Sequence, residues 1–534
     1  MRHRTRATAL AGGVILALVA SACGGDDSSD SSEGATTTAA PATSAGGTAT
    51  TAATATTAAA AQPTSIEAWE SLWADQRAAM VKRIKDNKWG KSADGKTMTG
   101  PEGWTVDLTK CAAGWSDTEG VSDATIKIGQ SISLSGTYAD YGNLGKAITA
   151  IFAHYNDQGF FKDASKNITR KVDYKMLDDG YDAARTIPNV DEFIDAEKVF
   201  AVWTLGSPST LKTYDKLNQR CIPQPIAMTG HSAWGDPVNH PWTTGAPAPT
   251  YSTEAILWGS FLEQRISEFP TDRKIKVASM VQNNDFGKLY DSAFKSFLAQ
   301  SKVLKDRVDY YSEAIEAQAP TVTDPMTTIA AKNPDVFITM LAGTQCTQII
   351  VEAAQNGMQK NAKYLFQPQT CPGSTFINKA KVGGDGSAGE GWWILNSGAK
   401  DAKDPAYQSD AYVAWFNNLL RQNGLDPNAS SNFGLGATYV FGVVQAFAIA
   451  GQLDGGVNRT NFNLALRSMD MTNPMLRPGI KFQMNGLKDA FLVEAGQFQQ
   501  WNAAKQTWED RGPIISLDGK IPLCAWNQAT SQCG

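Results

Sequence analysis

Histidine is scarce in this sequence: only four occur among 534 residues, and one of them, His3, lies at the very start. The G-x-S-x-G motif that positions a serine nucleophile is missing as well. General acid–base and nucleophilic catalysis both need such side chains beside a suitable partner. We therefore expect no enzymatic activity, no cofactor and no metal site.

A long basic block is also absent. The chain contains 48 basic and 53 acidic residues and has a net charge of −5, whereas nucleic-acid-binding proteins concentrate positive charge on one surface. After Ala20 we find no further apolar run of ~20 residues, the length that spans a bilayer. The sequence therefore predicts a soluble body that binds no nucleic acid.

The start of the chain has a clear pattern. Three arginines within the first six residues precede the apolar run Ala7–Ala20, and small residues then lead to Cys23. This pattern predicts a secretory signal over residues 1–22, too short to span a membrane. The segment resembles a bacterial lipoprotein signal, although Ala20 stands where such motifs most often carry leucine. The resemblance implies that Cys23 is acylated and anchors an exported protein to the cell membrane; the alternative is an ordinary secretory signal with an incidental cysteine.

Residues 23–63 consist almost entirely of Ala, Thr, Ser, Gly, Asp and Pro. Such a segment cannot bury enough apolar surface to offset its chain entropy, so we expect a disordered tether. About 40 flexible residues have an end-to-end distance on the order of 35 Å. An adhesive or glycosylated stalk has the same composition and stays open as an alternative.

Six cysteines remain once Cys23 is set aside for the lipid. An even number in an exported protein favours disulfides, and the spacings match no zinc pattern. Six cysteines allow 15 connectivities. The expected pairs are Cys524 with Cys533 in a short C-terminal loop (521–534), Cys346 with Cys371 after two strand-like segments, and Cys111 with Cys221, which are left over.

Residues 64–120 contain five of the 15 tryptophans. Thr64 and Glu67 can form a capping box, and apolar residues from Ile66 to Ile84 recur at helical spacing. We interpret this segment as an N-terminal extension, with one amphipathic helix and an irregular part, that packs on the body. A surface for docking a partner is the alternative.

From Thr125 onward, strand-like and helix-like segments alternate. This alternation predicts parallel sheets covered by helices on both faces. Two such series, before and after about residue 250, predict two doubly wound lobes, in which ligands collect at the carboxyl ends of the strands. The predicted strands are Thr125–Ser131, Val172–Leu177, Val199–Leu205, Ile222–Met228, Ile275–Val281, Asp335–Leu341, Tyr364–Gln367 and Trp392–Leu395.

The stretch IKIGQSISLSGTYADYGNLGKAI, from Ile126 to Ile148, resembles the opening of the leucine/isoleucine/valine-type solute-binding proteins of ABC transporters. The stretches LDDGYDAARTI, AVWTLGSPST, QNNDFGKLY, VFITMLAGTQ and YLFQPQT fit the same family, so the resemblance covers about residues 125–520. It implies an α/β fold of the type I periplasmic binding proteins, with two Rossmann-like lobes, a hinge and a solute-binding cleft. Lobe one would comprise 121–248 and 397–478, and lobe two 249–396 and 479–520. An ABC transporter permease would be the partner.

The resemblance also implies which residues face the solute. Small hydroxyls and exposed backbone amides donate hydrogen bonds to anionic groups, and tyrosines offer a flat apolar wall with a polar tip. Each Ser or Thr could equally be a helix cap, and the tyrosines could equally pack at the edge of the core. The implied residues are Ser135, Gly136, Thr137, Tyr138, Tyr141, Ser207, Ser209, Met228, Thr229 and Gly230 in lobe one, and Asn284, Asp285, Gly343, Thr344 and Thr370 in lobe two.

The chain departs from this family at the positions that hold a ligand's ammonium group. The amino-acid-binding members carry an acidic residue on the linker into lobe two, where this sequence has Pro247, with Glu254 several residues later. The acidic position after a lobe-two strand reads QPQTCPG, without a carboxylate. A buried ammonium needs a compensating charge or full hydrogen bonding. A carboxylate without an ammonium, or a neutral amide or aromatic compound, therefore fits as well as an α-amino acid.

These observations predict an extracytoplasmic, lipid-anchored solute-binding protein that hands a small organic solute to an ABC permease. Two other classes stay open: a binding module that reports its ligand to a sensor, and a structural or adhesive surface lipoprotein of the same fold.

Overall fold

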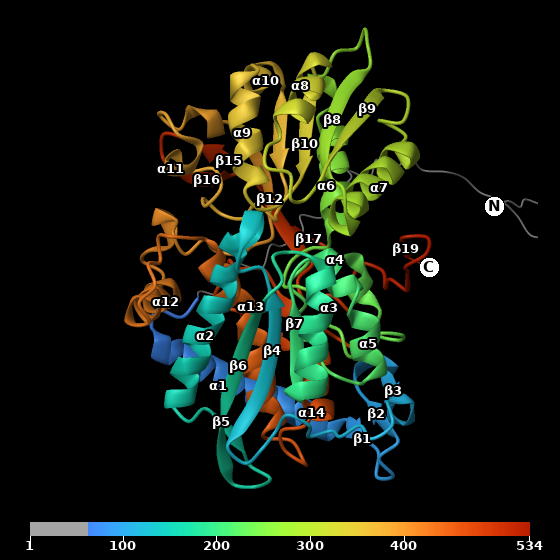
Figure 1. Cartoon of the computed structure of the whole chain (residues 1–534), viewed down its shortest axis with the longest axis vertical. Coiled ribbons are helices and arrows are strands. Elements are labelled where there is room, and N and C mark those ends of the chain that lie inside the picture. The colour runs from blue at the N-terminus through green and yellow to red at the C-terminus, as the bar shows by residue number, and fades with distance from the viewer. Residues whose placement is uncertain (1–61, 534) are drawn as a thin grey trace, which may run out of the picture. The chain divides into compact units, whose positions relative to one another are not determined.

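The computed structural model describes residues 62–533, most of which form two α/β lobes (Figure 1). The expected signal peptide 1–22, all but the end of the expected tether 23–63 and the expected lipidation site Cys23 lie outside the described residues.

Lobe one is built on a four-stranded sheet in the order β5-β6-β4-β7, in which only β5 is antiparallel. Apolar residues of α3 and α5 pack on one face of it, and α2 and α13 pack together on the other (Figure 1). Helices on both faces are what the alternating sequence predicted. The strands are β4 (Thr125–Ile132), β5 (Phe161–Asp163), β6 (Ile168–Asp178) and β7 (Ala201–Thr204), and the helices are α2 (Gly142–Asp157), α3 (Ala183–Asp191), α4 (Ser207–Leu211), α5 (Tyr214–Gln219), α12 (Ala411–Gln422), α13 (Asn432–Ala450) and α14 (Arg459–Arg467).

The strand predicted over Ile222–Met228 is wrong. This segment lies beside β7, where the amide of Met228 donates to the carbonyl of Thr204 (3.3 Å), but it forms only isolated bridges. Pro223 and Pro225 explain the difference, because neither can donate a backbone hydrogen bond to a ladder.

Lobe two has a larger sheet, with a path β16-β15-β12-β11-β10-β8-β9 and β17 paired to β15. Strands β8 to β12 run parallel, whereas β15 is antiparallel to β12 and to β16. The strands are β8 (Ile275–Gln282), β9 (Val308–Ile315), β10 (Val336–Met340), β11 (Tyr364–Gln367), β12 (Trp393–Asn396), β15 (Ala495–Asn502), β16 (Thr507–Asp510) and β17 (Ile515–Ser516). The helices are α6 (Tyr251–Gln264), α7 (Asp285–Gln300), α8 (Thr323–Ala331), α9 (Gln345–Gln355), α10 (Met358–Asn361) and α11 (Lys379–Val382).

The chain crosses between the lobes three times. It enters lobe two before α6 and leaves after β12. The last crossing comes after Leu492, because β14 (Phe482–Gln483) still pairs with β13 (Asp470–Met471) in lobe one. The crossing was expected at residue 479 and comes later in the structure. Strand β14 has only two residues, too few for a periodic pattern of apolar residues that would reveal it in the sequence.

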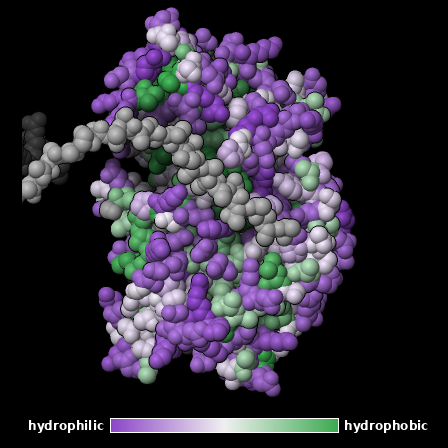
Figure 2. All heavy atoms as spheres, turned by 180° about the vertical axis from the view of Figure 1, so that it is seen from behind, coloured by the Kyte–Doolittle hydropathy of each residue, from purple (hydrophilic) through white to green (hydrophobic). Residues whose placement is uncertain are grey.

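The N-terminal extension packs on lobe one. Helix α1 (Ile66–Asp86) buries Trp69 and Trp73 completely and lies against α12, α13 and β13. Its cap is Ser65, whose Oγ accepts from the amide of Ala68 (3.2 Å), and not Thr64 as expected. The rest of the extension forms a small antiparallel sheet, β1 (Gly90–Lys91), β2 (Thr97–Thr99) and β3 (Thr105–Asp107). The aromatic residues thus serve packing within the chain, and the face shown in Figure 2 is mainly hydrophilic, with hydrophobic residues in scattered groups.

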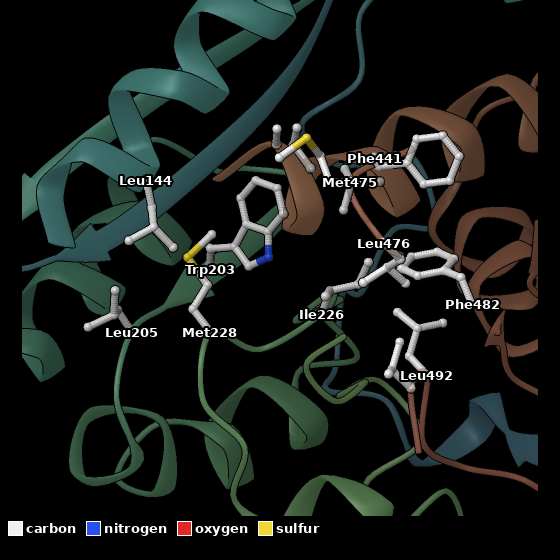
Figure 3. Packing of buried hydrophobic residues seen from close by; sticks show 14 of the residues in the cluster. Leu144, Trp203, Leu205, Ile226, Met228, Phe441, Met475, Leu476, Phe482 and Leu492 are labelled. Atoms are coloured by element: carbon white, nitrogen blue, oxygen red, sulfur yellow. The ribbon is translucent and has the colours of Figure 1, made fainter. Parts of the chain in front are cut away.

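The core of lobe one extends from the sheet to the third crossing. Figure 3 shows Trp203 and Ile226 packing between Leu144 on one side and Phe441 and Phe482 on the other. Phe441 belongs to α13, which is long and apolar enough to cross a membrane, yet 89% of it is buried inside the protein. Our expectation of no second long apolar run was therefore wrong, and burial identifies α13 as a core helix.

Three disulfides connect the cysteine pairs expected from the sequence. Cys111–Cys221 joins the extension to lobe one, Cys346–Cys371 joins α9 to the segment after β11, and Cys524–Cys533 closes the C-terminal loop, which holds β18 (Trp526–Asn527) and β19 (Gln532–Cys533).

Candidate functional site

A cavity of ≈ 80 Å³ lies between the lobes, at the carboxyl ends of the strands. Its wall is almost wholly apolar or aromatic, and no residue that lines it carries a charge. The lining residues are Tyr141, Leu144, Tyr181, Leu205, Gly206, Met228, Gly230, Thr438, Leu435 and Tyr439 from lobe one, Pro247, Ala248, Ser397 and Ala399 from the crossings, and Tyr251, Phe286, Ala342, Gln369 and Thr370 from lobe two. We refer to it as the apolar chamber.

Tyr181 forms one wall of the apolar chamber. Its ring stacks on Tyr138 at 4.0 Å, and its backbone φ of 64° is in the left-handed region. A Cβ on Gly206 would lie 2.4 Å from the ring, so only glycine fits beneath it. Tyr181 lies within the LDDGYDAARTI stretch but was not among the predicted site residues.

Four of the predicted site residues line the apolar chamber: Tyr141, Met228, Gly230 and Thr370. The two predicted tyrosines also form hydrogen bonds from lobe one to lobe two. The hydroxyl of Tyr141 donates to the carbonyl of Thr370 (2.6 Å) and accepts from the amide of Gly343 (3.1 Å). The hydroxyl of Tyr138 donates to the carbonyl of Ala317 (3.1 Å) and accepts from Gln282.

Three predicted hydroxyls are buried behind the chamber wall. Ser207 and Thr229 share a hydrogen bond of 2.8 Å between their side-chain oxygens, and the Oγ of Ser209 accepts from Thr186 (2.8 Å). Because they do not line the cavity, they support the loops that form it rather than face it.

The other predicted residues lie at the rim or cap helices. Ser135 donates its hydroxyl to Asp178 (2.6 Å), and Asn284 caps α7. The amide of Thr344 donates to the carbonyl of Thr137 (3.2 Å), which joins the lobes beside Gly343. The two remaining predicted residues also lie outside the chamber: Gly136 is exposed and Asp285 is in the first turn of α7.

No carboxylate replaces the missing acidic residue on the linker. Pro247 lines the apolar chamber, whereas Glu254 is fully buried on α6 and does not. Its carboxyl group accepts from the hydroxyl of Tyr290 and from the amide of Gln369 (2.9 Å). Burial raises the pKa of Glu254 to about 8. The apolar chamber therefore offers no negative charge to an ammonium group.

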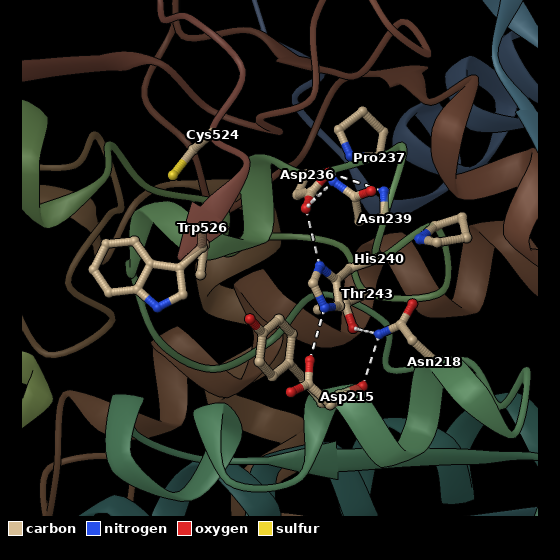
Figure 4. A network of polar contacts seen from close by, with 12 residues as sticks. Asp215, Asn218, Asp236, Pro237, Asn239, His240, Thr243, Cys524 and Trp526 are labelled. Atoms are coloured by element: carbon tan, nitrogen blue, oxygen red, sulfur yellow. Dashed lines mark hydrogen bonds and ion pairs between the residues drawn. The ribbon is translucent and has the colours of Figure 1, made fainter. Parts of the chain in front are cut away.

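The loop of the first crossing is held by a charged network away from the cavity (Figure 4). His240 lies between Asp236 (Nδ1–Oδ2, 3.0 Å) and Asp215 (Nε2–Oδ1, 2.8 Å) and stacks on Tyr214. Burial lowers the pKa of His240, but the hydrogen bonds to Asp236 and Asp215 outweigh it, so the net shift is upward. His240, hydrogen-bonded to both aspartates, thus fixes the loop that follows Gly230.

One phosphate-loop match in the extension has the wrong structural context. Residues 90–97 read GKSADGKT, the spacing of a nucleotide-binding loop. That motif works between a strand and a helix, whereas this stretch is the hairpin of β1 and β2. Within residues 62–533, no group of three or more His, Cys, Asp or Glu side chains is arranged to hold a metal ion.

A family model described as periplasmic binding protein matches residues 125–506. Among solved structures, a possible leucine/isoleucine/valine-binding protein from Rhodopirellula baltica SH 1 is 18% identical with a TM-score of 0.58, covering 75% of this chain and 98% of that chain. A branched-chain amino acid ABC transporter protein from Thermus thermophilus with bound valine is 13% identical, with a TM-score of 0.60 and coverage of 74% and 97%. A solute-binding protein from Rhodopseudomonas palustris BisB5, in complex with 3,4-dihydroxybenzoic acid, is 17% identical, with a TM-score of 0.58 and coverage of 74% and 98%. No curated protein matches the sequence.

Proposed function

Because the chain belongs to the periplasmic binding protein family and has the fold of its leucine/isoleucine/valine type, we propose that it captures one small organic solute between its lobes and delivers it to an ABC permease. The family acts in extracytoplasmic transport and not in catalysis. The observation that carries the proposal is the apolar chamber, which both lobes line and beside which Tyr138 and Tyr141 form hydrogen bonds between the lobes.

Closure across the cleft supports capture by a change between open and closed states. Several contacts between the lobes are hydrogen bonds to backbone groups, such as those from Tyr138 and Tyr141, and water can replace these bonds when the lobes separate. A solute that touches both lobes stabilises the closed state by its additional contacts there. The permease would then distinguish the closed protein from the open one.

The chamber favours a solute with a flat or branched apolar body. The hydroxyls of Tyr181 and Tyr439 line it, and neither forms a hydrogen bond with any residue in 62–533. They can bind a hydroxyl, amide or carboxylate oxygen of the solute. A free α-amino acid fits less well, because no charge in this chamber meets its ammonium.

A thermal-shift screen of the purified protein tests the proposal, with amino acids, aromatic acids, amides and amines as candidates. We expect at least one class to raise the unfolding midpoint. Ala342→Leu narrows the chamber and should abolish that rise, while Ala299→Leu, on the exposed face of α7, should leave it unchanged. An equal response in both variants would place binding outside the chamber.

Lipid anchoring through Cys23 is part of this proposal and rests on the sequence around it. When the full chain is expressed in a bacterial host, it should partition into the detergent phase, and Cys23→Ser should move it to the aqueous phase. Detergent partitioning that is unchanged by this substitution would refute an anchor at Cys23.

A further inference from the structure

A second cavity, of ≈ 330 Å³, adjoins the apolar chamber on the side of the second crossing. Four residues line both: Gln369, Ser397, Ala399 and Leu435. Unlike the first cavity, this one is lined by charged side chains, so we call it the polar chamber. A solute that fills the apolar chamber can extend past these shared residues into it.

The two basic residues of the polar chamber are already paired. All three hydrogen atoms of the Lys400 ammonium are used, at 2.7 Å each, by Asp410, the side-chain oxygen of Gln62 and the carbonyl of Pro474. Arg477 donates to Gln497 (2.5 Å) and to Asp510. The charge of Lys400 is therefore paired with Asp410, and that of Arg477 with Asp510.

Two of the four acidic residues of the polar chamber are likewise paired: Asp510 with Arg477, and Glu509 with Lys505 and Arg511. The other two, Asp401 and Asp404, form no ion pair within 4.0 Å with any residue in 62–533. Both basic residues of the chamber are in ion pairs, whereas Asp401 and Asp404 are not. The chamber therefore has an excess of negative charge.

The unpaired acids have neutral hydrogen-bond donors only. Asp404, which is 6% exposed, accepts from the amide of Ala406 (2.9 Å) and the hydroxyl of Thr507 (2.5 Å). Asp401 accepts from the amide and hydroxyl of Ser374 and from the hydroxyl of Ser431. Burial raises the pKa of Asp404, and the hydrogen bonds from Thr507 and Ala406 and the charge of Arg477 offset this rise only in part.

We propose that the polar chamber binds the cationic group of an amine solute through Asp404 and Asp401, while the apolar body of the same solute fills the apolar chamber. This inference rests on the proposed function and names its substrate class: an aryl or branched alkyl amine without a carboxylate beside the ammonium. An ammonium in this position gains charge-assisted hydrogen bonds to the buried Asp404 and the half-buried Asp401. The acidic group missing from the linker is thus replaced by acids that follow the second crossing.

Calorimetric titration of the purified protein with three matched probes tests the inference. 2-Phenylethylamine carries the ammonium, 2-phenylethanol keeps the aromatic body without charge, and phenylacetate reverses the charge. The amine should bind at least tenfold more tightly than the alcohol, and phenylacetate should bind most weakly. This comparison uses the unmodified protein, so it does not depend on any variant folding.

The variant Asp404→Asn then tests whether Asp404 binds the ammonium group of the amine. It should weaken binding of the amine about tenfold and leave binding of the alcohol within twofold, whereas Asp309→Asn, exposed on β9, should change neither. Tighter binding of phenylacetate or of the alcohol than of the amine would overturn the inference while leaving solute capture intact. If none of the three probes binds, the inference also fails, and solute capture is then judged by the wider thermal-shift screen alone.

Discussion

The extension and lobe two both contact lobe one, but through different kinds of interaction. The extension is attached by buried tryptophans, by a disulfide and by side chains such as Arg459, which is buried and donates to the carbonyls of Ser116, Val199 and Phe200. Lobe two meets lobe one across the cleft mainly through hydrogen bonds, such as those from Tyr138, Tyr141 and Thr344, with a smaller aromatic contact between Tyr141 and Phe376. Extensive apolar burial makes a permanent joint, whereas exchangeable hydrogen bonds allow the other joint to open.

The largest effect on stability is expected from a substitution in the contact between the extension and lobe one. Trp73 is fully buried, packs on Phe441 and Tyr412, and donates its indole N–H to the carbonyl of Thr472 (2.9 Å). Trp73→Ala should lower the free energy of unfolding by about 3–5 kcal/mol, the usual cost of such a cavity. Urea denaturation followed by circular dichroism measures it.

The matched control is Trp89→Ala, in the same extension but only half buried. Trp89→Ala should lower the free energy of unfolding clearly less than Trp73→Ala does. Equal losses in the two variants would contradict the view that α1 forms a core joint.

A smaller effect concerns Glu254, on the lobe-two side of the cleft. Its pKa of about 8 exceeds that of the unfolded chain, so its stabilising contribution is present below about pH 4.5 and is lost as the pH rises through 8. Glu254→Gln removes this titration. It should raise stability at pH 8 by about 2–4 kcal/mol relative to the wild type, with little difference at pH 4.

Thermal unfolding from pH 4 to pH 9 checks this prediction. A difference between variant and wild type that stays constant across that range would exclude a buried, protonated Glu254.

The smallest effect is expected from a substitution in the contact between lobe one and lobe two. Tyr141→Phe removes the hydroxyl that contacts Thr370 and Gly343. It should lower the free energy that favours the closed state over the open state by about 1 kcal/mol. By population shift, solute affinity should fall about fivefold, and the radius of gyration from small-angle scattering should increase.

Tyr155→Phe is the control, since its hydroxyl bonds Glu70 of the extension (3.0 Å) and touches no cleft residue. It should leave affinity and radius unchanged. A similar loss of affinity in both variants would show that hydroxyl removal acts through general loosening and not through the cleft.

Much of this fold could be predicted from the sequence because buried parallel strands are short apolar runs. Strand β11 begins and ends where predicted, at Tyr364 and Gln367. The segment Ile222–Met228 looked equally apolar, but its two prolines leave only isolated bridges. The expected cap Thr64 was one residue off, since Ser65 can satisfy the same helix end.

The candidate site was predictable only in part. The strand ends predicted Tyr141, Met228, Gly230 and Thr370 near the cleft, and these four residues line the chamber because the topology brings strand ends together. Whether a hydroxyl faces the chamber depends on its neighbours, and Ser207 turns to Thr229 instead. Chamber residues on helices, such as Tyr439 on α13, come from a part of the chain that no local motif connects to the strands.

Gln62 has a mechanical consequence. Its side chain bonds both Lys400, at the second crossing, and the carbonyl of Leu476, near the third. Whatever precedes this residue therefore joins the fold beside the pivot and not at the far end of either half. Because Gln62 bonds the segments at which the lobes are joined, we expect a movement of lobe two about the crossings to displace this attachment point little.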